Sequence, residues 1–207
     1  MLRLWGWIKT GYLRLIEPMI EWCVRNRISP NTITTVGTLA ACLVGVLFAL
    51  GHIRAGGWTL GLLAFFDVVD GAVARRSGRE TTFGSFYDAT LDRVADGFLF
   101  GGFVVFYAGH PVPRQTAMVL IATAALLATQ LTSYTRSRAE LVGVDMKGVG
   151  WMERPERITL LAAPQAFFGR AFDGWVHDGV VTLLAVTAVI TVVQRISHVA
   201  RATADRD

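Results

Sequence analysis

The stretch FFDVVDGAVARRSGRETTFGSFYDATLDRVADG, residues 65 to 97, places five aspartates within two otherwise apolar segments of this chain. Asp67 and Asp70 are three residues apart in the first segment, and Asp88 and Asp92 are four residues apart in the second. Residues at these spacings lie on one face of a helix. Two antiparallel helices joined by the intervening loop would therefore bring four carboxylates together at one end of the pair.

The composition of the whole chain indicates that these segments lie in a membrane. Of its 207 residues, 53% are hydrophobic and 17% are charged, whereas a soluble domain has about 25% charged residues. The mean hydropathy is +0.45. A soluble helical bundle would need a periodic polar face, which most of the apolar stretches lack. We therefore expect an all-α integral membrane protein.

Apolar stretches that approach the length of a transmembrane helix recur along the chain. They cover Ile33–Leu50, Trp58–Ala74, Phe86–Tyr107, Ala117–Tyr134, Ile158–Phe172 and Val180–Ile196. The fifth is the weakest, because Pro164 and Gly169 interrupt it. We expect a single domain over residues 1–207, with six transmembrane helices within residues 29–200.

Residues 1–28 have a different pattern, in which apolar residues alternate with Arg and Lys at helical spacing. This segment lacks the continuous apolar run and the small-residue cleavage site of a signal peptide. We expect an amphipathic helix on the cytoplasmic surface of the membrane, preceding the six spans.

The distribution of basic residues predicts the orientation of the chain. With a cytoplasmic amino terminus, all Lys and Arg except Arg54, Arg114 and Arg170 fall on or near the cytoplasmic side. Both termini should therefore be cytoplasmic, in a multi-pass protein of the cell (plasma) membrane. This bias also accounts for the net charge of +4, so no nucleic acid partner is expected. His52, His110 and His177 should lie in solvated outer loops.

The carboxylates need positive charge to offset their cost in the membrane. Each Asp at depth costs about 2.5–3.5 kcal/mol, so four would cost on the order of 10 kcal/mol. Buried ion pairs with Arg75, Arg76 or Arg93 are one solution. Divalent metal is the other, and we favour it: hard oxygen ligands without His or Cys suit Mg²⁺ or Mn²⁺. Four Asp suit two ions that clamp phosphate oxygens.

The full spacing of this region is Asp67-x2-Asp70-Gly71-x2-Ala74-Arg75-x8-Gly84-x3-Asp88-x3-Asp92. It resembles the complete signature of the CDP-alcohol phosphotransferases, integral membrane enzymes that transfer a phosphatidyl-type group from a CDP-lipid to an alcohol. The resemblance implies six transmembrane helices after a surface helix, usually in a homodimer.

The resemblance also implies roles for individual positions. Metal would be held by Asp67, Asp70, Asp88 and Asp92. The CDP-lipid, here CDP-diacylglycerol, would be bound by Asn31, Thr32, Ile33, Thr34, Gly71, Ala74, Arg75, Thr81 and Gly84. Asp92 would also be the catalytic general base, accepting the proton as the alcohol attacks the β-phosphorus. Asp96 lies outside the signature, and we expect it to support the site through a hydrogen bond or an Arg partner.

The acceptor alcohol is suggested by a second group of residues. The stretches SYTRSRAE, residues 133–140, and ERPER, residues 153–157, are rich in Arg, which binds phosphate in a bidentate fashion. They are similar to the phosphatidylinositol phosphate synthase branch of the family. That similarity implies inositol 1-phosphate as acceptor, contacted by Ser133, Arg136, Arg138, Arg154 and Arg195.

Three alternatives stay open from sequence. Glycerol 3-phosphate also carries an anionic phosphate, so a phosphatidylglycerophosphate synthase is the main rival within the family. A cation transporter could use intramembrane carboxylates, although these would lie near mid-membrane rather than at one end of two helices. A noncatalytic lipid-binding scaffold would not need Asp92.

Overall fold

The computed structural model describes residues 17–63, 72–73, 75–76, 78, 81–152 and 154–204, with the backbone alone at residue 155. Within these residues every regular element is a helix. After a helix over residues 17–25, the elements are α2 (Pro30–Ala49), α3 (Ile53–Leu63), α5 (Thr82–Gly109), α6 (Gln115–Leu141), α7 (Arg154–Phe168), the 3₁₀ turn η1 (Phe172–Gly174) and α8 (Trp175–Thr203).

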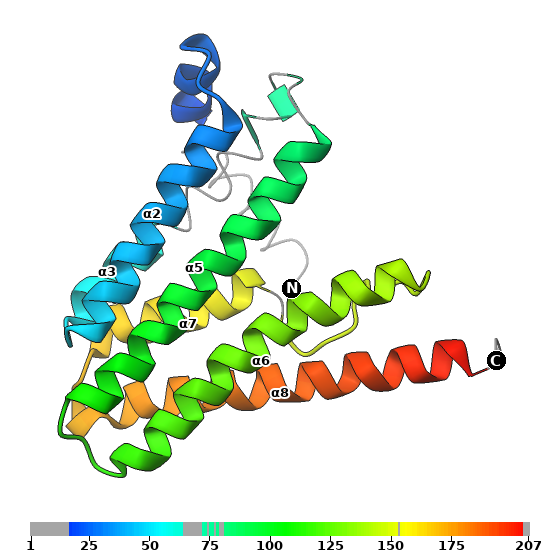
Figure 1. The fold of residues 1–207 in the computed structure, drawn as a ribbon. Coiled ribbons are helices and arrows are strands. Elements are labelled where there is room, and N and C mark those ends of the chain that lie inside the picture. The colour runs from blue at the N-terminus through cyan, green and yellow to red at the C-terminus, as the bar shows by residue number, and fades with distance from the viewer. Residues whose placement is uncertain are drawn as a thin grey trace, which may run out of the picture.

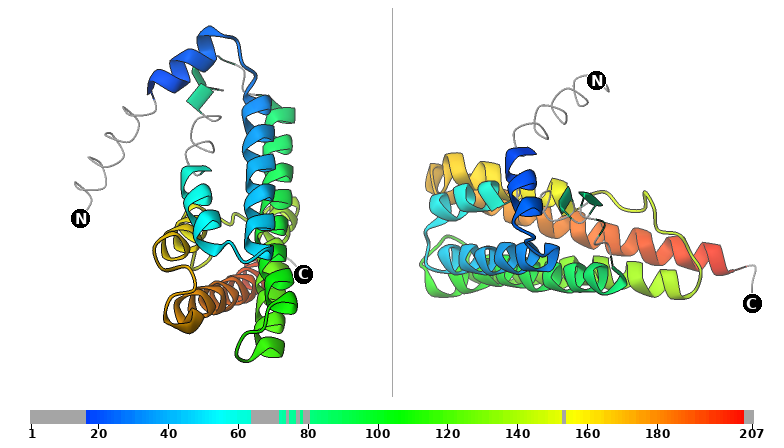
Figure 2. Two further views of the ribbon diagram at one scale, coloured as in Figure 1. Left: turned by 90° about the vertical axis from the view of Figure 1, so that its left-hand side faces the viewer. Right: turned by 90° about the horizontal axis from the view of Figure 1, so that it is seen from above.

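The long helices form two arms that diverge from a common base (Figure 1). In one arm α2 packs along α5, and in the other α6 packs along α8. Contacts between α5 and α6 join the arms, and α3 packs against α7. The two further views in Figure 2 show the same pairing. The space between the arms is therefore walled by α5, α6 and α8, with α7 nearby.

Each predicted span overlaps one of these helices, but only some of the helices are long and apolar enough to cross a membrane. Three such segments occur in the part of the chain that is described: Pro30–Ala49, Gln115–Leu141 and Phe172–Thr203. α7 has 15 residues, fewer than the roughly 20 of a span, and the described part of α3 covers 11 residues up to Leu63. α5 has 28 residues, but Asp88, Asp92, Arg93 and Asp96 interrupt its apolar character.

Helix ends follow from the local sequence. α2 begins at Pro30, whose fixed φ suits the first helical position, and Ser29 precedes it without a side-chain capping bond. The N-cap of α5 is Thr81, whose Oγ1 accepts a hydrogen bond from the Gly84 amide at 2.9 Å. α7 contains Pro164 and stops at Phe168, where Gly169 has a positive φ of 55°. The end of α7 thus lies four residues before the predicted one.

The contact between α2 and α5 depends on two glycines. A Cβ on Gly102 would lie 2.2 Å from the Gly45 carbonyl oxygen, and a Cβ on Gly45 would lie 2.3 Å from the Phe98 carbonyl oxygen. The two backbones can approach closely because neither residue has a side chain. Phe48 and Phe103 then stack with ring centroids 4.5 Å apart in the buried core.

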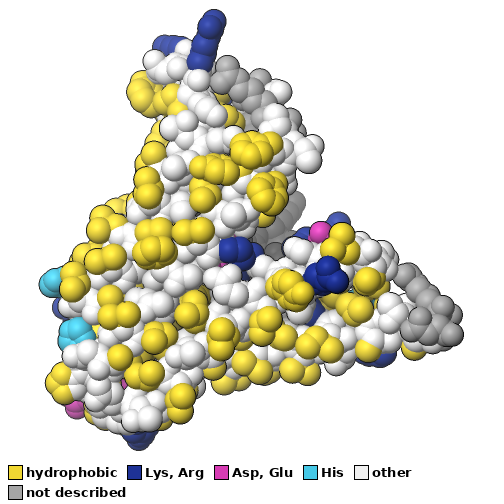
Figure 3. Space-filling view, in the orientation of Figure 1, with side chains coloured by type: hydrophobic (Ala, Val, Ile, Leu, Met, Phe, Trp, Pro, Cys, Tyr) yellow, Lys and Arg dark blue, Asp and Glu magenta, His cyan; other side chains and the backbone are white. Residues whose placement is uncertain are grey.

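Hydrophobic side chains cover much of the outer surface of both arms, while basic side chains gather where the arms meet (Figure 3). Exposed apolar residues include Leu39 and Leu43 on α2, Phe98 on α5 and Leu127 on α6. An apolar exterior with a polar interior cleft is typical of a protein surrounded by lipid.

The prediction that His177 lies in a solvated loop is wrong. His177 is in the first turn of α8 and is fully buried, in contact with the rings of Phe103, Phe106 and Tyr107. Its Nδ1 lies 2.9 Å from Gln165 Oε1 on α7. His177 lies close to the end of a predicted span, which suggested exposure to solvent. In the structure, α5 and α7 pack over the start of α8 and exclude solvent from the imidazole.

Only the end of the predicted surface helix is described. Residues 17–25 are helical, and Ile20 and Cys23 are buried against Ile33, Ala72 and Val73. This helix is therefore tied to the start of α2 and to the segment that follows Asp70. Residues 1–16 lie outside the described part.

Candidate active site

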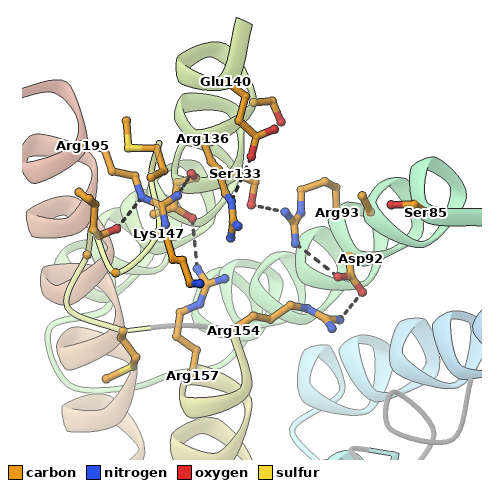
Figure 4. Close-up of a pocket in the computed structure, with 18 residues that line it drawn as sticks. Ser85, Asp92, Arg93, Ser133, Arg136, Glu140, Lys147, Arg154, Arg157 and Arg195 are labelled. Atoms are coloured by element: carbon orange, nitrogen blue, oxygen red, sulfur yellow. Dashed lines mark hydrogen bonds and ion pairs between the residues drawn. The ribbon is translucent and has the colours of Figure 1, made fainter. Parts of the chain in front are cut away.

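A cavity of about 520 Å³ lies in the fork between the two arms (Figure 4). Its lining comes from α5, α6, the loop after α6, α7 and α8. The lining residues are Ser85, Ala89, Asp92, Arg93, Thr132, Ser133, Arg136, Ser137, Glu140, Met146, Lys147, Gly148, Val149, Gly150, Met152, Arg154, Arg157 and Arg195. Six of these side chains are basic and two are acidic, so the cavity favours an anionic ligand.

Asp92 is the acidic group at the α5 wall of this cavity. Its Oδ1 lies 2.9 Å from Arg154 Nη2, and its Oδ2 lies 3.9 Å from Arg93 Nη2 (Figure 4). The side chain of Asp92 is 23% exposed, so water and substrate can reach it. Asp88 is one turn earlier on α5 and is exposed. The two carboxylates therefore share a face of α5, as their spacing predicts.

Asp96 continues this face one turn further into the protein, where it is buried. Arg93 Nη2 is 3.3 Å from Asp96 Oδ2, Arg154 Nε is 3.7 Å from Oδ1, and Arg157 Nη2 is 3.8 Å from Oδ2. The prediction that Asp96 pairs with an Arg is confirmed. Ion pairs, the alternative explanation for the carboxylates, thus exist at both residues, half-buried at Asp92 and buried at Asp96.

The predicted acceptor residues come from three helices, and four of the five line the cavity. Ser133 Oγ accepts a hydrogen bond from Arg93 Nη1. Arg136 is exposed and pairs with Glu140, one turn later on α6, at 3.4 Å. Arg195 on α8 donates from Nε to the Val149 carbonyl at 3.1 Å and from Nη1 to the Thr132 carbonyl. These bonds hold Arg195 across the cavity from α5.

Arg138 does not line this cavity. It faces an apolar groove between α6 and α8, together with Tyr134 and Val199, and Arg195 lies between this groove and the cavity. Two residues along a helix correspond to a rotation of about 200°, so Arg138 points away from the side that carries Arg136. The sequence shows both arginines but does not show which side of α6 faces the cavity. The proposed acceptor site therefore includes Arg136 and not Arg138.

Three further cationic residues that line the cavity were not predicted as site residues. Arg93 follows Asp92 directly and bonds Ser133, while Arg157 lies three residues after Arg154 and reaches Thr132 Oγ1 at 3.5 Å. Lys147 belongs to the loop between α6 and α7. The i, i+3 spacing of Arg154 and Arg157 could have identified Arg157, but no local pattern marks Lys147.

The residues predicted to bind the CDP-lipid are described in part. A Cβ on Gly84 would lie 3.0 Å from Thr81 Oγ1 and 3.4 Å from Asn31 Oδ1, so these three positions meet where α2 and α5 begin. Thr32 and Thr34 are in the first turns of α2, and Ile33 is buried in the cluster beneath the surface helix. Gly71 and Ala74 lie outside the described residues.

Arg75 is described, and its side chain is exposed. Its neighbour Arg76 binds Glu17 of the preceding helix at 2.5 Å, and this hydrogen bond raises the pKa of the Arg76 guanidinium. The two neighbouring arginines therefore differ in their contacts. Arg76 binds the helix over residues 17–25 through Glu17, whereas Arg75 is the residue predicted to bind CDP-diacylglycerol.

Two of the four predicted metal ligands, Asp88 and Asp92, are among the described residues. Asp67 and Asp70 lie outside the described residues, and among those that are described no group of three His, Cys, Asp or Glu gathers. The two remaining carboxylates, Asp88 and Asp92, supply hard oxygen donors on one face of α5, and Asp92 lines the cavity. That donor set fits Mg²⁺ or Mn²⁺.

Comparison with known proteins agrees with this geometry. The family model for CDP-alcohol phosphatidyltransferase matches residues 27–194, which run from α2 to within α8 and include the whole cavity lining except Arg195. The chain belongs to this family. It is therefore a phosphatidyltransferase and, with its three apolar helices, a membrane protein.

Relatives of the chain have one function in common. It is 36% identical over 189 residues to phosphatidylinositol phosphate synthase of Mycobacteroides abscessus, covering 91% of this chain and 84% of that protein. It is 34% identical over 205 residues to the Streptomyces avermitilis enzyme of the same name, covering 95% and 82%.

Solved structures of the Mycobacterium tuberculosis phosphatidylinositol phosphate synthase are similar as well. The crystal structure with CDP-DAG bound matches with a TM-score of 0.81 and 34% identity, over 90% of this chain and 94% of that chain. The complex with manganese and citrate matches with a TM-score of 0.79, over 88% and 87%.

Proposed function

We propose that this protein transfers the phosphatidyl group of CDP-diacylglycerol to inositol 1-phosphate, giving phosphatidylinositol phosphate and CMP. The observation that carries the proposal is the cavity, in which Asp92 faces several guanidinium groups from α5, α7 and α8. A carboxylate base beside an arginine-rich pocket suits an alcohol that itself carries a phosphate.

The donor end is proposed to combine metal and nucleotide contacts. Asp67, Asp70, Asp88 and Asp92 would hold two divalent ions, which supply charge neutralisation for the pyrophosphate and for the departing CMP. The meeting of Asn31, Thr81 and Gly84 supports a nucleotide contact there, because the absence of a side chain at Gly84 lets two polar side chains approach its backbone closely. Thr32, Ile33, Thr34, Gly71, Ala74 and Arg75 complete the proposed donor set.

Asp92 is proposed as the general base. It accepts the proton of the attacking hydroxyl while that oxygen bonds to the β-phosphorus and the bond from this phosphorus to the CMP oxygen breaks. A carboxylate cannot ionise a free alcohol beforehand, so proton transfer accompanies attack. Arg154 Nη2, 2.9 Å from Asp92 Oδ1, fixes the direction of the carboxylate.

The acceptor phosphate is proposed to bind Ser133, Arg136, Arg154 and Arg195. Arg195 already donates to two backbone carbonyls, which fixes the position of its guanidinium on the α8 wall. Arg154 reaches Asp92 from the α7 wall. An acceptor held between them would have its phosphate on the arginines and its hydroxyl toward Asp92.

The membrane arrangement is part of the same proposal. We place six transmembrane helices in the plasma membrane, with both termini and the cavity on the cytoplasmic side. The charge bias supports this orientation. We further propose a homodimer, as the family resemblance implies.

The test is CMP release by the purified protein with CDP-diacylglycerol and Mg²⁺, comparing inositol 1-phosphate, free inositol and glycerol 3-phosphate. Release with inositol 1-phosphate alone is the expected result. Preference for glycerol 3-phosphate would overturn the acceptor assignment and leave the family reaction intact. Equal CMP release with free inositol would show that the protein does not recognise the phosphate of the acceptor.

A further inference from the structure

Asp96 is a buried carboxylate that the reaction as described does not use. It is 1% exposed and lies on α5 one turn beyond Asp92, behind the wall of the cavity. A charged group in such a place is costly unless partners neutralise it. Its partners therefore indicate what it does.

Three guanidinium groups converge on Asp96. Arg93 lies on the same helix, at 3.3 Å, while Arg154 and Arg157 reach it from α7, at 3.7 Å and 3.8 Å. Arg157 is itself only 7% exposed. These three positive charges repel one another, and a carboxylate at their centre offsets that repulsion.

Each guanidinium has a second partner beyond Asp96. Arg93 Nη1 donates to Ser133 Oγ, Arg157 Nη1 lies 3.5 Å from Thr132 Oγ1, and Arg154 Nη2 lies 2.9 Å from Asp92 Oδ1. A planar guanidinium held along two directions has a fixed orientation. All three arginines line the cavity, so Asp96, their common partner, fixes the positions of three positive charges on the cavity wall.

We propose that Asp96 is a positioning residue that orients Arg93, Arg154 and Arg157 for the acceptor phosphate, without touching any substrate itself. This inference rests on the proposed function only in requiring a phosphorylated acceptor. The carboxylates on this face of α5 would then have different roles. Asp88 and Asp92 would bind metal, Asp92 would also accept the proton, and Asp96 would increase the affinity for the acceptor.

The test is steady-state kinetics of the purified Asp96→Asn protein, with acceptor and donor varied separately. Without the carboxylate, the three guanidinium groups lose their common charge-assisted partner, so we expect an increase in acceptor KM on the order of tenfold. The KM for CDP-diacylglycerol and the Mg²⁺ dependence should stay unchanged. An unchanged acceptor KM, or equal increases in both KM values, would overturn the proposal.

Asp178→Asn is the matched control. Asp178 is a carboxylate on α8 that accepts a hydrogen bond from Tyr107 Oη at 2.8 Å, and Tyr107 is about 22 Å along α5 from Asp92 at 1.5 Å per residue. Its loss should lower thermal stability without separating the two KM values. If Asp96→Asn does not fold, Asp96→Glu replaces it, because it keeps the charge but displaces it; the same split in KM is expected, and its absence counts against the proposal.

The wild-type protein distinguishes failure of this proposal from failure of the proposed function. If it releases no CMP with inositol 1-phosphate but does so with glycerol 3-phosphate, the acceptor assignment fails, and Asp96 is judged with glycerol 3-phosphate. If only an acceptor without a phosphate is used, both proposals fail.

Discussion

Arg154 Nη2 lies 2.9 Å from Asp92 Oδ1, which joins the arginine-rich wall of the cavity to the proposed base. The two residues come from different helices, α7 and α5, and are 62 positions apart in the sequence. In the proposed function, the hydroxyl of the acceptor would therefore lie near Asp92 while its phosphate binds Arg154. The geometry leads to the following predictions.

Replacing Asp92 with Asn should abolish turnover, because the amide cannot accept the proton of the attacking hydroxyl. General base catalysis contributes about 10²–10⁴-fold, so CMP release should fall by at least that factor. Binding of CDP-diacylglycerol, measured by calorimetry in detergent, should be largely retained. Turnover at the wild-type rate would remove Asp92 as the base.

Replacing Arg195 with Gln should weaken acceptor use more than donor binding. The lost charge-assisted contact corresponds to about a tenfold or larger increase in acceptor KM. Arg138→Gln is the matched control, since Arg138 faces the other groove, and its acceptor KM should equal that of the wild type. If the two variants behave alike, Arg195 is not at the acceptor phosphate.

Removing divalent metal should stop the reaction. With EDTA in excess, CMP release should disappear, and added Mg²⁺ or Mn²⁺ should restore it, since the proposed aspartate ligands are hard oxygen donors suited to both. Initial rates across a metal titration provide the measurement. Full activity in EDTA would contradict a metal-dependent site.

Gly102→Ala should destabilise the protein by separating α2 from α5. The new Cβ would lie 2.2 Å from the Gly45 carbonyl oxygen, and overpacking of this kind costs about 1–3 kcal/mol. Gly101→Ala is its control, because a Cβ there meets no atom within 4 Å among the described residues. Thermal unfolding in detergent should show a lower Tm for the first variant alone. A normal Tm for Gly102→Ala would contradict the close helix contact.

Tyr107→Phe should remove the hydrogen bond to Asp178 and leave catalysis unchanged. Loss of one such bond costs about 1 kcal/mol, which should appear as a small decrease in Tm. The acceptor and donor KM values should match those of the wild type, since this pair is far along α5 from Asp92. A changed acceptor KM would mean that this end of the bundle is coupled to the site.

Some of the site could be read from the sequence because helical spacing is a local property. The shared face of Asp88 and Asp92 follows from four residues of separation, and it needs no knowledge of the neighbouring helices. The pairing of Asp96 with arginine follows from the cost of burying a lone charge. Arg138 was predicted together with Arg136, although it does not line the cavity, because the sequence does not reveal which side of α6 faces α5.

The sequence by itself determined the helical class, the membrane character, the family and the acidic face of α5, because composition and fixed spacing are properties of the chain alone. Only the tertiary structure decided which arginines share a carboxylate, why His177 is buried and where Gly45 and Gly102 let two helices meet. Those features depend on the rotation and distance of helices relative to one another, which packing between distant residues sets.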